Sequence, residues 1–103
     1  MDYFTGDLGA GGARQCAVEL RFSGSLGEPF ASFALKRARR LSLRGWMKAH
    51  DDEHVTILAE GPEALVDAFE LVCSLGPIDS DVESWTRIEQ ATGINSQAFE
   101  RRS

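Results

Sequence analysis

Residues 16–43 read CAVELRFSGSLGEPFASFALKRARRLSL and change their hydrophobic period halfway along. Val18, Leu20 and Phe22 alternate with charged or polar residues, which predicts a strand over residues 16–24 with one buried face. In the segment PFASFALKRARRLSL, apolar residues recur every three or four positions behind an early proline, which predicts an amphipathic helix. A glycine-rich loop joins the two segments. The ordered part of the chain therefore begins with a strand followed by a helix.

The rest of the chain repeats these two periods. Alternating segments predict further strands, and DDE predicts a hairpin turn between two of them. A segment that opens Gly-Pro-Glu and closes Gly-Pro predicts a second helix, because proline suits the first helical turn and a glycine followed by proline ends a helix. The predicted elements after the first strand are a helix over 29–43, strands over 46–50 and 54–61, a helix over 62–76, and strands over 81–90 and 98–102.

This order, β-α-β-β-α-β with a short C-terminal strand, predicts an α+β fold. A helix that is apolar on one side must bury that side against another element, and a sheet that is apolar on one face offers the surface. We expect a two-layer α/β sandwich of ferredoxin-like topology, with both helices on one face of an antiparallel sheet. Fold alone implies no function, because this architecture hosts many activities.

The composition is that of one small folded domain. The chain has 103 residues, of which 43% are hydrophobic and 26% charged, and its formal net charge is -5. An acidic chain is a poor general nucleic-acid binder, because neutralising phosphates supplies most of that affinity. No apolar run approaches the roughly 20 residues that cross a bilayer, and the N-terminus lacks the pattern of a secretory leader. We therefore expect a cytoplasmic protein that binds neither nucleic acid nor membranes.

The two ends of the chain and its cysteines carry further expectations. Residues 1–15 hold four glycines and few apolar residues, which predicts a flexible N-terminal tail ahead of a domain over residues 16–103. Cys16 and Cys73 lie far apart among apolar neighbours, so we expect two reduced, buried thiols. The charged residues 100–102 discourage edge-to-edge pairing of the last strand, so we expect a monomer.

Four segments resemble the acylphosphatase family. They are GEPFASF at 27–33, LRGWMKA at 43–49, AEGP at 59–62 and FER at 99–101. The resemblance covers most of residues 16–102 and implies the sandwich fold of that family, an acylphosphatase-like domain. It also implies the family's activity, which is the cleavage of carboxyl-phosphate anhydrides by a small cytoplasmic hydrolase that uses no metal and no cofactor.

The same resemblance places unlike residues where the family has its chemistry. The family loop reads G-x-V-Q-G-V-G-F-R, and its successive N–H groups form an anion-binding nest at the start of a helix. Ala31 stands where the family has the arginine that clamps the phosphate, and Ala49 where it has the asparagine that orients water. Glu28 adds a carboxylate, and Pro29 removes an N–H donor. The degenerate anion-binding loop comprises Ser23, Gly24, Ser25, Leu26, Gly27, Glu28, Pro29 and Phe30.

These departures predict a non-catalytic acylphosphatase-like domain that acts as a binding or regulatory module, with a protein partner or a small anion as its ligand. The alternative is an acylphosphatase that hydrolyses the carboxyl-phosphate bonds of acyl phosphates with a displaced cation. The candidate substitute cations are Arg21, Arg44 and Lys48. Lys48 neighbours Ala49 on a predicted strand, however, so their two side chains point to opposite faces.

Three other features have ordinary structural interpretations. Five cations follow one another along the first predicted helix and just beyond it: Lys36, Arg37, Arg39, Arg40 and Arg44. A charged run of this kind is typical of a solvated helix face, and a patch for an anionic ligand, RNA or an acidic partner is the alternative. His50 and His54 flank a turn rather than sharing a helix face, so we expect no metal site. Trp46 and Trp85 occupy strand positions, which is typical of packing aromatics.

Overall fold

The computed structural model describes residues 14–93 and 97–103 of the chain. Its elements, in chain order, are β1 (Gln15–Ser25), α2 (Gly27–Arg40), β2 (Arg44–Asp51), β3 (His54–Pro62), α3 (Glu63–Leu75), β4 (Asp81–Gln90) and β5 (Phe99–Arg102). The predicted tail over residues 1–15 lies outside the described residues except for Arg14 and Gln15, and Gln15 is the first residue of β1. The order of the elements is the predicted one.

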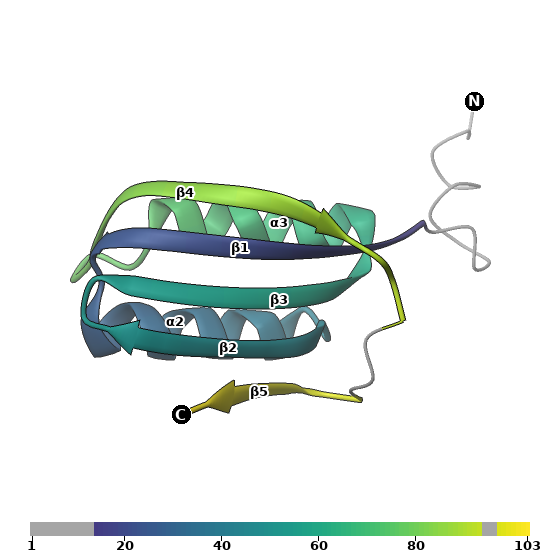
Figure 1. Ribbon diagram of the computed structural model, residues 1–103, viewed down its shortest axis with the longest axis horizontal. Helices are drawn as coiled ribbons and strands as arrows, with labels where there is room; N and C mark the ends of the chain where they lie inside the picture. Colours follow the sequence, from purple (N-terminus) through teal and green to yellow (C-terminus); the bar gives the residue numbers. More distant parts are fainter. Residues whose placement is uncertain (1–13, 94–96) are drawn as a thin grey trace.

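The five strands form one sheet in the order β4-β1-β3-β2-β5, and both helices cover the same face of it (Figure 1). Neighbouring strands are antiparallel except β2 and β5, which are parallel. The antiparallel sheet that the sequence predicts is therefore mixed at one edge, because the chain crosses from the β4 edge and enters β5 in the direction of β2 (Figure 1). The fold is the predicted two-layer α/β sandwich of ferredoxin-like topology.

β1 lies between β4 and β3, and its alternation sets the two faces of the sheet. Val18, Leu20 and Phe22 are at most 1% exposed and face the helices. Glu19 and Arg21 point to the other side, because successive strand residues alternate. We call that side, on which neither α2 nor α3 lies, the open face. Paired residues of antiparallel strands share a face, so the register extends this division to β3 and β4.

α2 begins at Gly27, two residues before the predicted start at Pro29. Pro29 is still within the first turn, where a missing N–H breaks no helical hydrogen bond. Gly27 has a φ of 62°, a left-handed conformation that glycine adopts at no steric cost. The buried side of the helix consists of Phe30, Ala31, Ala34 and Ala38. A glycine that begins the helix therefore corrects the predicted boundary.

α2 ends at Arg40, whereas the apolar spacing predicts a helix through Leu43. Ser42 has a φ of 58°, and its N–H bonds to the carbonyl of Arg39, while the N–H of Leu43 bonds to that of Ala38, each at 3.0 Å. These two bonds form a Schellman motif, which ends a helix by reversing the chain. Leu43 is 2% exposed and reaches the core from beyond the reversal, which is why the apolar spacing outlasts the helix.

β2 and β3 form the predicted hairpin, with Asp52 and Glu53 between them. β2 extends from Arg44 to Asp51, slightly further at both ends than the predicted strand over 46–50. α3 agrees closely with the predicted helix over 62–76: its buried side consists of Val66, Phe69 and Cys73. No helix in the described ranges has the length and apolar character needed to span a membrane.

Both cysteines are buried and unpaired, as the sequence predicts. Burial raises the pKa of the Cys73 thiol to about 12, and it raises the pKa of Cys16 as well.

Trp85 packs against both the core and α3. Trp85 is 41% exposed, stacks on Phe22 at a centroid distance of 6.4 Å and donates to Glu70 of α3 at 2.9 Å. These contacts confirm a packing role for Trp85.

Candidate functional site

The loop that resembles the family's anion-binding segment runs from the end of β1 into the first turn of α2. Ser23, Gly24 and Ser25 are the last residues of β1, and a β-bulge lies between Ser23 and Gly24. Leu26 has right-handed backbone angles, φ -94° and ψ -66°, and Gly27 follows with a left-handed φ of 62°. A right-handed residue followed by a left-handed one turns successive N–H groups to one side and forms a nest.

This nest is filled by a main-chain oxygen of the same chain. The N–H groups of Leu26 and Gly27 both donate to the carbonyl of Asp52, each at 2.9 Å. The N–H of Gly24 donates to the neighbouring carbonyl of Glu53 at 3.1 Å. Three donors of the loop are thus paired with the β2–β3 turn. An anion that approached the nest would have to displace a carbonyl oxygen from two of them.

Ala31 lies on α2, and Ala49 lies on β2 with its side chain on the face of the sheet that the helices cover. Ala31 is in the second turn of α2 and is 0% exposed. Ala49 pairs with buried Val55 across the hairpin, and it packs against the core as a partly buried residue. A methyl group neither donates a hydrogen bond nor carries charge. At both positions the side chain contributes packing.

One guanidinium does reach the loop, and it comes from β5. Arg101 Nη1 donates to Glu28 Oε2 at 2.6 Å, and Arg101 Nη2 donates to Glu28 Oε1 at 2.9 Å, which makes the pair bidentate. These hydrogen bonds lower the pKa of Glu28 and raise that of Arg101. Arg101 pairs with Met47 on β2, and Ala49 is two residues further along the same face. The pair therefore spans from the start of α2 to the edge of the sheet beside Ala49.

Carboxylates surround the loop. A hollow of about 420 Å³ at the start of α2 has Glu28, Asp52, Glu53 and Asp79 among its lining residues. Of these four, only Glu28 forms an ion pair with a described residue. The charge at the position of the family's phosphate loop is therefore predominantly negative.

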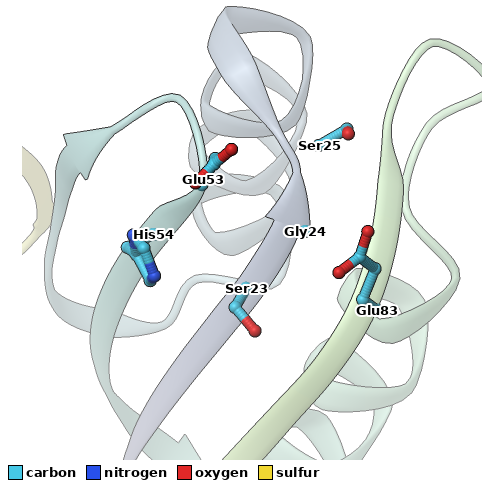
Figure 2. Close-up of a pocket in the computed structure, with 6 residues that line it drawn as sticks. All are labelled: Ser23, Gly24, Ser25, Glu53, His54 and Glu83. Carbon is cyan, nitrogen blue, oxygen red and sulfur yellow. The ribbon is translucent and has the colours of Figure 1, made fainter.

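A neighbouring hollow of about 240 Å³ lies where β1 ends between β3 and β4 (Figure 2). Glu53 and Glu83 lie on either side of Gly24, and His54 and Ser23 are paired on the neighbouring strands β3 and β1 (Figure 2). The Ser23 hydroxyl is 2.8 Å from the Ser84 hydroxyl on β4. Both hollows at this end of the sheet thus contain carboxylates.

The three candidate substitute cations lie on the open face. Arg21 alternates with core residues of β1, and Lys48 alternates with Met47 and Ala49 of β2, so both point away from the helices. Arg44, at the start of β2, lies 3.4 Å from the Glu60 carboxylate. The structure brings none of these three cations to the start of α2.

Sequence reasoning missed two charged residues near these positions. Arg101 could have been found from the alternation of the last strand, in which it shares a face with the buried Phe99. Glu60 is 2% exposed, accepts from the Gly93 N–H at 2.8 Å and pairs with Arg44. No sequence pattern predicts the burial of Glu60, because it occupies an outward position of β3 and its contacts with Gly93 and Arg44 come from residues distant in sequence.

The two histidines form hydrogen bonds within the β2–β3 hairpin. His54 Nδ1 is 2.9 Å from Asp51 Oδ1, and His50 Nε2 is 2.9 Å from Thr56 Oγ1. The pKa of Asp51 is lowered, because its carboxylate accepts from the Glu53 N–H and then from His54. Within the described ranges, no three His, Cys, Asp or Glu side chains gather into a metal-binding group.

The basic run on α2 includes contacts within the protein. Arg39 Nε donates to the carbonyl of Phe99 on β5 at 3.1 Å. The Arg37 guanidinium lies 5.3 Å from the centroid of the Phe33 ring. Part of the run therefore helps to hold α2 against the last strand and to cover its own aromatic side chain.

Comparison with known proteins places this fold in one family. The acylphosphatase family model matches residues 18–101. The acylphosphatase of Pseudothermotoga lettingae is 31% identical over 85 residues, a match that covers 82% of this chain and 94% of that protein. The crystal structure of acylphosphatase from Bacillus subtilis superposes with a TM-score of 0.79 at 27% identity, covering 85% of this chain and 99% of that chain.

The same fold occurs inside a larger protein. The crystal structure of full-length HypF, in its phosphate- and nucleotide-bound form, superposes with a TM-score of 0.75 at 18% identity. That match covers 88% of this chain and 12% of the HypF chain, and at this identity it shows the fold alone. The family match over residues 18–101 and the Pseudothermotoga relative are decisive. The chain belongs to the acylphosphatase family.

Proposed function

We propose that this chain is a non-hydrolytic member of the acylphosphatase family and acts as a binding or regulatory module. The observation that carries the proposal is the pair of methyl groups at Ala31 and Ala49, which match the arginine and the asparagine of the family pattern. Ala31 is 0% exposed, and a methyl group neither donates a hydrogen bond nor carries charge.

The backbone of the loop supports the proposal independently. Hydrolysis needs donors fixed around the developing charge before the reaction begins, and losing one such donor typically costs about 10²–10³-fold in rate. The N–H groups of Leu26 and Gly27 are already bonded to Asp52. Pro29 has no N–H to offer. Several donors are thus withdrawn from a phosphate at the same loop.

The negative charge around the loop also disfavours the binding of a phosphate group. Two like unit charges 4 Å apart repel by about 4 kcal/mol at an effective dielectric of 20. Glu28 is neutralised by Arg101, but Asp52, Glu53 and Asp79 form no ion pair with a described residue. A phosphate group would meet these carboxylates at the entrance to the loop.

A second candidate function is hydrolysis of acyl phosphates with a displaced cation, and Arg101 is the observation that favours it. Its guanidinium lies at the first turn of α2, whereas Arg21, Arg44 and Lys48 lie on the open face. In this alternative, Arg101 would exchange the Glu28 carboxylate for a phosphate oxygen, since a guanidinium binds both in the same bidentate manner.

The module interpretation sets further expectations. We expect it to need no metal and no cofactor, to act in the cytoplasm as a monomer, and to have a protein partner or a small anion as its ligand. HypF supports the idea that this fold can serve as one part of a larger protein, because the matched region is 12% of that chain. Co-purification from the native source would identify a protein partner.

The test is the hydrolysis of benzoyl phosphate, followed by loss of the substrate, with the Bacillus subtilis acylphosphatase as the positive control. We expect the wild-type chain to act no faster than the uncatalysed background. Restoring the family residues in one variant, Ala31→Arg, Ala49→Asn, Glu28→Val and Pro29→Gly, is expected to give measurable but incomplete turnover, because the carbonyl of Asp52 still occupies two donors.

Controls separate the two candidate functions. Because Ala31 is fully buried, the folding of the restored variant is checked by circular dichroism, and Ala49→Asn alone serves as the milder variant. Turnover by the wild-type chain that Arg101→Gln abolishes would establish the hydrolase with a displaced cation and overturn our proposal. Wild-type turnover that survives Arg101→Gln would overturn both.

A further inference from the structure

The open face of the sheet holds a cleft of about 270 Å³ over β4, β1 and β3. The register places six polar side chains there in two neighbouring rows that cross the three strands: Ser84, Ser23 and His54 in one row, and Thr86, Arg21 and Thr56 in the other. Paired residues on neighbouring strands point to the same side. The six side chains therefore share one surface, on the side of the sheet away from α2.

The cleft combines four hydroxyl groups with one guanidinium and one imidazole. A hydroxyl can donate to an oxyanion, and so can each N–H of an arginine or histidine. No carboxylate belongs to the described residues that line this cleft. The hollows at the start of α2 differ in this respect, because Glu28, Asp52 and Asp79 line one of them and Glu83 another.

The row that contains Arg21 continues across the whole sheet. Thr56 pairs with Lys48 on β2, and Lys48 pairs with Arg102 on β5. This row thus places three cations and two threonines side by side on one face. Glu19 forms an ion pair with Arg21, so the net positive charge of this row comes from Lys48 and Arg102, and positive charge attracts anions.

The two basic side chains of the cleft keep donors available for a ligand. Glu19 accepts from Arg21 through Nε, and the described contacts of Arg21 leave both Nη groups for another acceptor. Asp51 contacts His54 at Nδ1, which leaves Nε2. The side chains of Arg21 and His54 are 61% and 56% exposed, so a ligand can reach them from solvent.

We propose that this cleft binds the phosphate group of a small ligand. Arg21 would supply the bidentate charged contact. The neutral donors would be Thr56 and one hydroxyl of the Ser23–Ser84 pair, because the other hydroxyl of that pair uses its proton in their mutual hydrogen bond. The volume lies just below the about 300–1,000 Å³ of pockets that bury a drug-sized ligand, which suits a phosphate group with a small substituent. This cleft is on the opposite side of the sheet from Ala31 and Ala49, so the proposal does not depend on whether the family's own site is active.

The experiment is a titration of the ¹⁵N-labelled full chain with inorganic phosphate and, separately, with phenyl phosphate, at constant ionic strength. We expect saturable shifts of the amides of residues 21–23, 54–56 and 84–86 at millimolar concentration, with the amides of residues 26–28 and 30 unmoved. Equal affinities would identify free phosphate as the ligand, and tighter binding of phenyl phosphate would identify a phosphate monoester. Absence of saturable shifts with both compounds up to about 20 mM would overturn the proposal.

Matched variants make the assignment specific. Arg21→Gln is expected to weaken binding at least 10-fold, and Ser84→Ala, which changes no charge, about threefold. Arg40→Gln removes the same charge from the exposed side of α2 and is expected to leave the affinity within twofold. Equal weakening by Arg21→Gln and Arg40→Gln would mean attraction by overall charge alone, and shifts centred on residues 26–30 would mean binding at the start of α2. Either result overturns the proposal, whatever the outcome with benzoyl phosphate.

Discussion

Glu28 and Arg101 join the first turn of α2 to the C-terminal strand through two charged hydrogen bonds of 2.6 and 2.9 Å. Their side chains are 67% and 36% exposed, so water and salt screen the attraction. The bidentate geometry nevertheless fixes both partners in one arrangement. These hydrogen bonds are the main cause of the lowered pKa of Glu28. The stability that the pair contributes to the fold therefore depends on pH.

Arg101→Gln tests this pair. A carboxyl group whose folded pKa is lowered stabilises the fold above its unfolded pKa, ordinarily about 4.3, and the stabilisation is lost as the pH falls through the folded value. We therefore expect Arg101→Gln to lower the urea midpoint at pH 7 and the gap to the wild type to close in acid. Arg102→Gln, which removes the neighbouring cation from above Trp46, is the control and should show no such closing. A gap for Arg101→Gln that persists undiminished to about pH 3 would contradict the assignment.

At the scale of elements, the ends of α2 are decided by local backbone chemistry. Its C-terminus reverses at Ser42, which holds a left-handed φ of 58° without being glycine. For residues other than glycine this conformation costs roughly 1–2 kcal/mol, because Cβ approaches the following carbonyl oxygen. The Schellman bonds from Ser42 and Leu43 hold it in place.

Ser42→Gly is expected to stabilise the protein by about 0.5–1 kcal/mol, because glycine relieves the strain but loses more chain entropy on folding. The matched control is Ser32→Gly, the same chemical change inside α2, which is expected to destabilise by about 1 kcal/mol. Equilibrium unfolding in urea measures both. Destabilisation by Ser42→Gly, of the size seen for Ser32→Gly, would refute the account of this helix end.

The elements themselves could be predicted from the sequence, and their ends could not. The alternation of Val18, Leu20 and Phe22 and the three- to four-residue spacing on the helices are properties of local sequence, and burial follows from them. The end of α2 depends on Ser42, whose left-handed conformation has no signature in a serine. The direction of β5 depends on which edge of the sheet the chain reaches after β4, which local patterns do not encode.

At the scale of the whole molecule, β5 closes the sandwich. Phe99 is 2% exposed, and its ring lies 6.2 Å from that of Phe69 on α3. Arg39 of α2 binds the carbonyl of the same residue. A strand of four residues thus contacts both helices as well as β2, and its first residue, Phe99, is part of the core.

Phe99→Ala is therefore expected to cost about 3–5 kcal/mol, because it leaves a cavity where the sheet edge meets both helices. Phe99→Leu, which keeps most of the volume, is expected to cost about 1–1.5 kcal/mol. Urea unfolding followed by tryptophan fluorescence measures both changes. A loss of stability below about 1 kcal/mol for Phe99→Ala would show that β5 contributes little to the packing of the core.

At the candidate site, the sequence could predict which side chains stand at the family positions, but not the contacts that those positions make. Ala31 and Ala49 can be identified from the resemblance, because it fixes positions along the chain. The roles of Arg101 and of the Asp52 carbonyl depend on contacts between residues far apart in sequence, and a main-chain oxygen has no sequence signature at all. The open face likewise follows from the strand register, which places Arg21 beside residues of two other strands.

The carbonyl of Asp52 in the nest restricts which changes to the sequence could empty the nest. Every amino acid presents the same peptide oxygen, so no point substitution at that position removes it. Emptying the nest would instead require a β2–β3 hairpin of a different length, in which the turn no longer contacts Leu26 and Gly27. Freeing both N–H groups of the nest would thus require an insertion or a deletion.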